Sequence, residues 1–115
     1  MKSSGSQNGF GMQASFLRPY SIYVNWTSTI TADGIVPYSA IYVAELYEYC
    51  IRVINATNYV SNFAGNCGVS GDINGNLITS RFGIIRDITK GPENSLILAD
   101  ASFNKIKKID FTTGK

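Results

Sequence analysis

The feature that most constrains this chain is that its sequence repeats itself. A shift of 66 residues aligns the early part of the chain with the later part: Asn8-Gly9 with Asn74-Gly75, Ala14 with Ser80, Phe16 with Phe82 and Ile22 with Ile88. A shift of 55 residues aligns the segments after Ala40: Ile41–Glu45 with Leu96–Asp100, Ile51 with Ile106, Ile54 with Ile109 and Asn55 with Asp110. The difference is an insertion in the first copy between Asn25 and Ala40. We therefore divide the chain into two copies of one unit, residues 1–73 and 74–115, whose faces must be buried by neighbouring units.

Each copy consists of short apolar and aromatic runs that Gly, Asn, Asp or Pro interrupt after a few residues. Runs of this length, rich in β-branched and aromatic residues, are typical of strands, and no longer window keeps a helical period. The expected strands are Ser21–Asn25, Ala40–Glu45, Cys50–Ile54 and Tyr59–Ala64 in the first copy and Ile85–Thr89, Ser95–Asp100 and Lys105–Asp110 in the second. The sequence predicts an all-β chain.

The composition narrows the functional classes. Only 16% of the 115 residues are charged, while Ser, Thr and Asn together supply 30 of them, a balance that argues against intrinsic disorder. The net charge of +2, without a long basic run, argues against a nucleic-acid binder held by phosphate contacts. No apolar run approaches the ~18 residues of a membrane span, and residues 1–11 lack the apolar region of a signal peptide.

The repeated unit resembles the NHL repeat, one blade of a β-propeller. In the second copy the resemblance lies in Leu98-Ala99-Asp100, Asn104, Ile106, Lys108-Ile109-Asp110 and Thr113-Gly114. In the first copy it lies in Phe16, Pro19, Tyr42-Val43-Ala44, Ile51-Arg52, Ile54 and Val60–Gly65. The first copy departs from the pattern where Glu45 and Asn55 replace Asp and in its long loop after Asn25. The resemblance covers nearly the whole chain.

This resemblance implies β-propeller-type blades, each an antiparallel sheet of four strands, a to d. We expect about two blades, the second incomplete because its outer strand d is missing. Two blades do not close a ring, since propellers need 4–8 of them. Three explanations stand: a fragment of a longer propeller, several chains forming one ring, or a strand donated head to tail by the next chain. The last arrangement makes an open filament unless the rotation closes.

Two N-x-T sequons mark candidate glycosylation sites, at Asn25 and Asn55. Asn25 follows strand a and Asn55 ends strand c. In an up-and-down blade these two connections emerge on the same side. We therefore expect both acceptors to face solvent at one end of the blade, and N-linked glycans on at least one of them.

Cys50 and Cys67 are expected to form a disulfide at the opposite end of the blade. Cys50 begins strand c, and Cys67 lies in the connection from strand d to the next blade. The alternative is a pair of free or buried thiols in a cytosolic protein. Together with the sequons, oxidation favours an extracellular or cell-surface location, although no signal peptide is visible. Two cysteines without histidine make no structural zinc site.

Exposed aromatic and basic side chains are further candidate sites. Trp26, in the inserted loop, and Tyr47 and Tyr49, between strands b and c, are a candidate contact surface for a protein or glycan; the alternative, which we favour, is packing against an adjacent blade. The three lysines of the last strand, Lys105, Lys107 and Lys108, fit a solvated strand edge.

Catalysis has little support in this sequence. With no histidine there is no ordinary catalytic triad. We interpret Glu45, Asp87 and Asp100 as isolated carboxylates bonded to nearby backbone. We expect no enzyme, catalytic residue, cofactor or metal.

The expected function is an extracellular structural or adhesive glycoprotein module that assembles with itself, including into a fibre by strand completion between chains. The alternative is a fragment of a closed NHL-like propeller that binds a protein, glycan or RNA ligand. The expected partners are other copies of the chain or the remaining blades of a longer one. A third interpretation, a fragment of a catalytic propeller, needs histidines outside this sequence.

Overall fold

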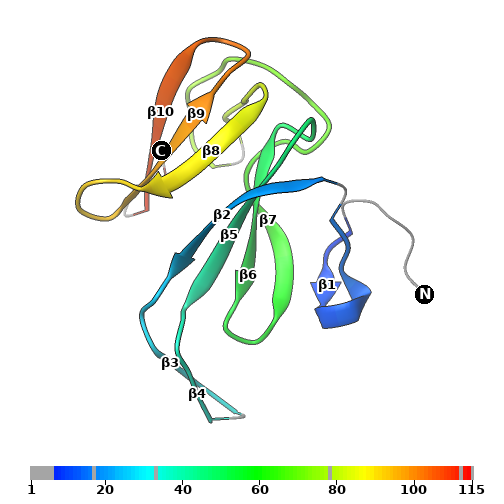
Figure 1. Cartoon of the computed structure of the whole chain (residues 1–115), viewed down its shortest axis with the longest axis vertical. Coiled ribbons are helices and arrows are strands. Elements are labelled where there is room, and N and C mark those ends of the chain that lie inside the picture. Colours follow the sequence, from blue (N-terminus) through cyan, green and yellow to red (C-terminus); the bar gives the residue numbers. More distant parts are fainter. Residues whose placement is uncertain (1–6, 17, 33, 78, 112, 115) are drawn as a thin grey trace.

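The computed structural model describes residues 7–16, 18–32, 34–77, 79–111 and 113–114. Of the two predicted copies, residues 1–6 and 115 lie outside the described part. The described chain is all-β and folds into two antiparallel sheets of the blade type and a small hairpin (Figure 1). It contains no helix that is long and apolar enough to cross a membrane.

The first sheet has the strand order β1-β7-β6-β5-β2. Its strands are β1 (Gly9–Phe10), β2 (Pro19–Asn25), β5 (Ala40–Glu45), β6 (Cys50–Asn55) and β7 (Tyr59–Gly65). The last four confirm the predicted strands a to d of the first copy, to within two residues at each end. The short strand β1 was not predicted. It pairs with the outer edge of β7, Gly9 opposite Val60, and a short 3-10 turn, Gly11–Gln13, follows it.

The second sheet has the order β10-β9-β8. Its strands are β8 (Ile85–Lys90), β9 (Ser95–Asp100) and β10 (Lys105–Asp110). These bounds confirm the three strands predicted for the second copy. All pairings are antiparallel, and both copies show a register shift near the start of strand a, between Pro19 and Ser21 and between Ile85 and Asp87.

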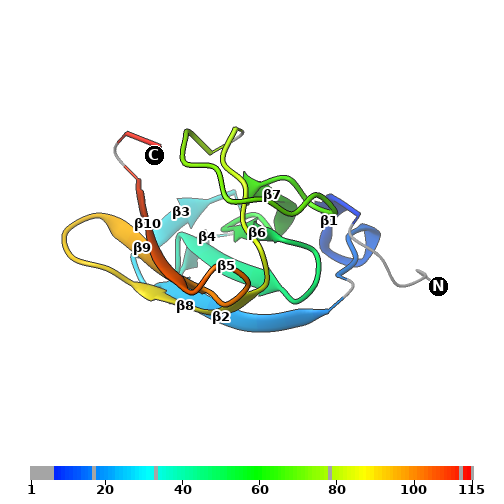
Figure 2. The ribbon, with the colours of Figure 1, turned by 90° about the horizontal axis from the view of Figure 1, so that it is seen from above.

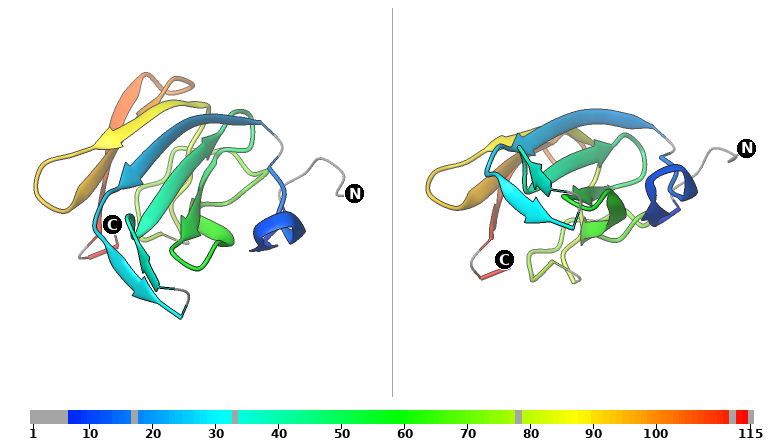
Figure 3. Two further views of the ribbon diagram at one scale, coloured as in Figure 1. Left: turned by 60° about the horizontal axis from the view of Figure 1, so that its bottom comes forward. Right: turned by 90° about the horizontal axis from the view of Figure 1, so that it is seen from below.

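The inserted segment of the first copy forms a hairpin of its own. β3 (Thr29–Thr31) pairs with β4 (Gly34–Val36), and Figure 3 shows the hairpin extending away from the ends of β2 and β5. Ile30 and Ile35 on it are 84% and 76% exposed. The sequence indicates only a loop here, because runs of three residues are too short to distinguish from one.

The two sheets pack face to face through their alternate side chains. The shared core consists of Ala40, Tyr42, Ala44, Ile51 and Ala64 from the first sheet, and Phe82, Ile85, Ile88, Leu96, Leu98 and Ile109 from the second copy. The first strands of the two sheets, β2 and β8, lie side by side (Figure 2). There the Ser21 hydroxyl donates to Asp87 over 2.8 Å and accepts the Ile88 amide N–H over 3.1 Å.

The repeat seen in the sequence is also a repeat in space. An isolated bridge joins Gln7 to Ser15 in the first copy, and another joins Ile73 to Arg81, 66 residues later, in the second. The loop that precedes strand a therefore has the same pairing in both copies. This correspondence allows each residue of one copy to be compared with its equivalent in the other.

Candidate functional site

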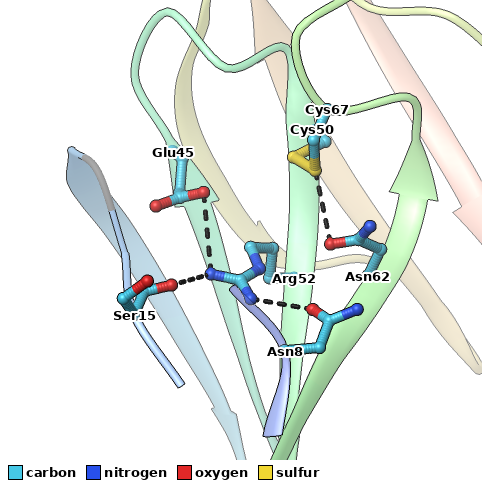
Figure 4. Close-up of a disulfide and its surroundings, with 7 residues drawn as sticks. All are labelled: Asn8, Ser15, Glu45, Cys50, Arg52, Asn62 and Cys67. Atoms are coloured by element: carbon cyan, nitrogen blue, oxygen red, sulfur yellow. Dashed lines mark hydrogen bonds and ion pairs between the residues drawn. A yellow bond between two sulfur atoms is a disulfide. The ribbon is translucent and has the colours of Figure 1, made fainter. Parts of the chain in front are cut away.

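A buried arginine organises the first sheet (Figure 4). The guanidinium of Arg52, on β6, is fully buried and lies 3.9 Å from the carboxylate of Glu45, which is also fully buried. It donates hydrogen bonds to the Ser15 carbonyl oxygen and, over 2.8 Å, to Asn8 Oδ1. It also stacks on Phe16, 4.7 Å from the ring centroid. Burial lowers the pKa of Arg52, against the opposing effect of the Glu45 charge.

The second copy repeats this arrangement with different residues. Lys107, equivalent to Arg52, lies 2.9 Å from Asp100, the equivalent of Glu45. It also contacts the Arg81 carbonyl oxygen at 3.4 Å and lies 5.4 Å from the ring centroid of Phe82. Asp72 adds a second carboxylate 2.9 Å away. Burial opposes protonation of Lys107, but its bonds to the two carboxylates outweigh that effect and raise its pKa.

These contacts correct two predictions. Lys107 is not part of a solvated strand edge, since its side chain is only 9% exposed; the alternation of a strand places it on the same face as buried Ile109. Glu45 and Asp100 are not isolated, because each faces a cation, although Asp100 also accepts the backbone N–H of Gly83 over 2.9 Å as expected. The charges attach the loop before strand a to strands b and c, which is a structural role.

The predicted disulfide is confirmed, between Cys50 and Cys67, whose Cα atoms are 4.9 Å apart. Cys50 pairs with both Glu45 and Gly65 across the sheet. The disulfide therefore lies at the end of the first sheet where β5 passes into β6. It attaches the connection that leaves β7 to that end, which we call the disulfide end.

The two sequons lie at the opposite end, as predicted. Asn25 and Asn55 both pair with Ala40, so they are two strand spacings apart, about 10 Å. Each side-chain oxygen accepts the hydroxyl proton of the threonine two residues later, over 2.9 Å from Thr27 and 2.7 Å from Thr57. Asn55 is exposed and Asn25 is partly exposed. Their glycosylation stays a prediction.

The structure separates the predicted aromatic contact residues. Trp26 is 72% exposed and follows Asn25 at the sequon end. Tyr47 is 46% exposed and Tyr49 is half-buried, and both lie at the disulfide end. Exposure of Trp26 and Tyr47 runs against the packed interpretation that we favoured. The three side chains nevertheless do not form one surface, because they stand at the two ends of the sheet.

Tyr47 belongs instead to a group of side chains that only the structure brings together. The Arg18 guanidinium lies 5.8 Å from the ring centroid of Tyr47, and that of Arg86 lies 5.9 Å from the ring centroid of Tyr20. All four side chains are exposed. The Leu46 amide N–H donates to the Arg18 carbonyl oxygen over 2.8 Å, which holds the start of β2 against the turn after β5. We call Arg18, Tyr20, Tyr47 and Arg86 the aromatic–arginine surface.

The chemistry available there is recognition. A guanidinium stacked on an aromatic ring keeps its N–H donors free in a fixed plane that matches carboxylate or phosphate oxygens. The tyrosines add apolar faces and hydroxyl groups. Nothing in the sequence pointed to this surface, because its members are far apart in the chain and only Arg18 and Tyr20 are near neighbours. Among the described residues, no group of three or more His, Cys, Asp and Glu side chains is placed to hold a metal ion.

The largest concavity lies in the second copy, on the free side of β10. It is a groove of about 770 Å³ between residues 73–77 and 105–109, completed by Ser80, Phe82 and Gly114. Ile106 in its lining is 73% exposed. Backbone of β10 forms one wall, and the loop before Ser80 forms the other.

The sheets, their side-by-side first strands and the repeated loops together define a chain of two blade-like antiparallel sheets. Solved structures of similar fold come from Bacteroides thetaiotaomicron. A protein of unknown function matches with a TM-score of 0.74 and 26% identity over 92% of this chain and 24% of its own. An auxiliary nutrient binding protein matches with a TM-score of 0.70 and 22% identity over 92% and 26%.

A third protein of that bacterium, whose name proposes a phosphatase, matches with a TM-score of 0.76 and 19% identity over 95% of this chain and 25% of its own. This chain thus spans about a quarter of the length of these structures. No protein-family model matches the sequence, and no curated protein does.

Proposed function

We propose that this chain is a section of an NHL-like β-propeller that binds, without catalysis, a glycan carrying acidic groups. The observation that carries the proposal is the aromatic–arginine surface at the disulfide end. Tyr20 and Tyr47 offer exposed ring faces of the kind on which the apolar side of a sugar ring packs. Arg18 and Arg86 offer paired donors for a carboxylate on the same ligand.

Two observations support a section of a larger ring. The equivalent strands β2 and β8 lie side by side, as strands around a common axis do. The face of the first sheet that carries Ile51 is covered by the second copy, whereas Ile106, at the equivalent position of the second sheet, is 73% exposed. One further blade on that face would bury it in the same way.

The low net charge favours a glycan over RNA. A nucleic acid would contact many phosphates, and the chain carries only +2 without a basic run. The predicted glycans at Asn25 and Asn55 would stand at the far end and leave this surface open. The nutrient-binding protein among the similar structures has 22% identity with this chain, which shows the fold alone, so the proposal rests on the surface.

The test is calorimetric titration of the chain with an oligogalacturonide, which carries one carboxylate per sugar. The matched neutral oligogalactoside and oligouridylate are the comparison ligands. We expect binding of the acidic glycan alone, weakened at least tenfold by Arg86→Gln and by Tyr20→Ala. Trp26→Ala, at the other end of the sheet, serves as the control and leaves the affinity unchanged. Equal binding of all three ligands, or none by the acidic glycan, refutes the proposal.

A second candidate is the structural or adhesive extracellular module that assembles with itself. The free edge of β10 beside exposed Ile106 favours it, because an open strand edge with an apolar side chain recruits further strands. The disulfide fits an oxidising location. Light scattering and electron microscopy of the chain test it: a filament or an open-ended series of sizes is expected, and a monomer or a fixed small oligomer refutes it.

A further inference from the structure

The two sheets differ by one strand at equivalent places. In the first sheet, β6 pairs with β7 on its outer side, and β1 pairs with the far edge of β7. In the second sheet the equivalent of β6 is β10, and its outer side has no strand among the described residues. The order β1-β7-β6-β5-β2 therefore corresponds to a loop, a gap, and then β10-β9-β8.

The loop on the far side of that gap is already in place. Residues 75–76 are the equivalents of β1, and the bridge from Ile73 to Arg81 repeats the bridge from Gln7 to Ser15. In the first copy this loop is separated from β6 by β7. In the second it is separated from β10 by the groove of about 770 Å³. The groove occupies the position that β7 occupies in the first copy.

The walls also limit what can enter. In the first copy the loop strand and β6 lie on either side of one strand, two strand spacings or about 10 Å apart. A groove with that origin takes a single extended segment. The edge of a second, intact sheet would collide with residues 73–77 before its outer strand reached β10. A whole sheet from another copy is therefore a poor fit.

The turn after β10 directs the chain toward the groove. In the first copy Asn55 opens the turn by accepting the Thr57 amide N–H, and Asn58, with φ of 67°, ends it before β7 begins. In the second copy the Gly114 amide N–H donates to the Asp110 carbonyl oxygen over 2.7 Å, and Gly114 has φ of 73°. Gly114 itself lines the groove. Both turns thus end in a left-handed residue that reverses the chain.

We propose that the groove is an acceptor for one further β-strand, antiparallel to β10, which the same polypeptide supplies in continuation from Gly114. Its chemistry follows from β7, where Val60 and Ala64 are buried and Phe63 packs on Tyr42 at 4.8 Å between ring centroids. The occupant carries apolar residues at those positions and polar ones between them. This inference does not depend on the proposed glycan binding.

The experiment extends the chain after Lys115 with a second copy of residues 59–65. The matched control carries the same extension with proline at alternate positions, which removes the N–H donors that pairing needs. The readout is amide hydrogen exchange resolved along β10, with β6 as the internal standard of folding. We expect at least tenfold slower exchange in β10 with the pairing extension than with the proline control, and no difference in β6.

Two further arms test the source of the strand. The same seven-residue segment is added to the unextended chain as a free peptide, and the unextended chain alone is studied over a range of concentrations. Protection of β10 by the covalent extension, with weaker protection by the peptide at equal concentration, supports the proposal. Equal exchange with both extensions overturns it, as does protection that arises only when chains associate. No glycan is present, so the outcome is separate from that of the glycan titration.

Discussion

Replacing Arg52 with methionine is the sharpest test of how this fold is held together. The substitution keeps most of the side-chain volume and removes the charge. Arg52 and Glu45 are both fully buried, 3.9 Å apart. At that separation and an effective dielectric constant near 20, their attraction is about 4 kcal/mol. The same environment penalises both charges, so the intact pair adds little net stability.

Breaking the pair on one side is different. Arg52→Met leaves the Glu45 carboxylate buried without its cation, and leaves the Ser15 carbonyl oxygen and Asn8 without their donor. We expect the free energy of unfolding to fall by about 3–5 kcal/mol. A domain of this kind has about 5–15 kcal/mol in total. With a urea slope of about 2 kcal/mol/M, the midpoint falls by about 2 M.

The assay is urea unfolding followed by intrinsic fluorescence, with the slope checked for constancy. The double variant Glu45→Met with Arg52→Met should recover to within about 1 kcal/mol of the natural chain, because no charge remains buried. Arg52→Lys is the matched control, since the second copy uses a lysine at this place, and it should cost less than Arg52→Met. A loss below about 1 kcal/mol for Arg52→Met, or additive losses in the double variant, would show that the pair is not a coupled buried unit.

Four further measurements test other contacts of the structure. Cys50→Ala with Cys67→Ala should lower the free energy of unfolding by about 3 kcal/mol, and reduction of the natural chain should match it; unchanged urea midpoints contradict this. Bonds from lysines hold the pKa of Asp72 below its ordinary 3.8, so its stabilisation is present above that pH and lost as the pH falls below it; Asp72→Asn should flatten urea midpoints measured between pH 7 and 3. Glu93 is exposed with φ of 56°, so Glu93→Gly should raise the melting temperature, by a gain of about 0.5 kcal/mol, whereas Glu93→Ala should not. Secretion from a eukaryotic host should add a glycan that Asn55→Gln removes, as seen by intact mass.

The strands were predictable because the local pattern and the tertiary environment agree. Runs such as Ala40–Glu45 and Ser95–Asp100 carry β-branched or apolar residues over strand length between clear turn signals. The antiparallel order of such runs also fixes which connections share an end. That is why the disulfide and the shared end of the sequons could be expected from residue numbers alone.

What the sequence did not predict depends on pairing between distant segments. β1 is two residues long and exists because Gly9 and Phe10 meet the free edge of β7. The aromatic–arginine surface likewise needs β2 and β8 to lie side by side before Arg86 can reach Tyr20. Neither contact leaves a periodic signal, because each partner alone is an ordinary exposed residue.

The buried cations show why comparison of residue types missed the most repeated device of the fold. In the first copy the Arg52 guanidinium has Glu45, the Ser15 carbonyl oxygen and Asn8 as acceptors.

In the second copy the Lys107 ammonium has a shorter acid, Asp100, the Arg81 carbonyl oxygen, and in place of the amide a second carboxylate, Asp72. An ammonium is a compact, strongly hydrated charge and a guanidinium a delocalised, weakly hydrated one, so the lysine needs more negative charge at closer range to be buried. The repeat preserves a satisfied buried cation over an aromatic ring. It does not preserve the residues that satisfy it, and only the shared phenylalanine remained visible when the two copies were aligned.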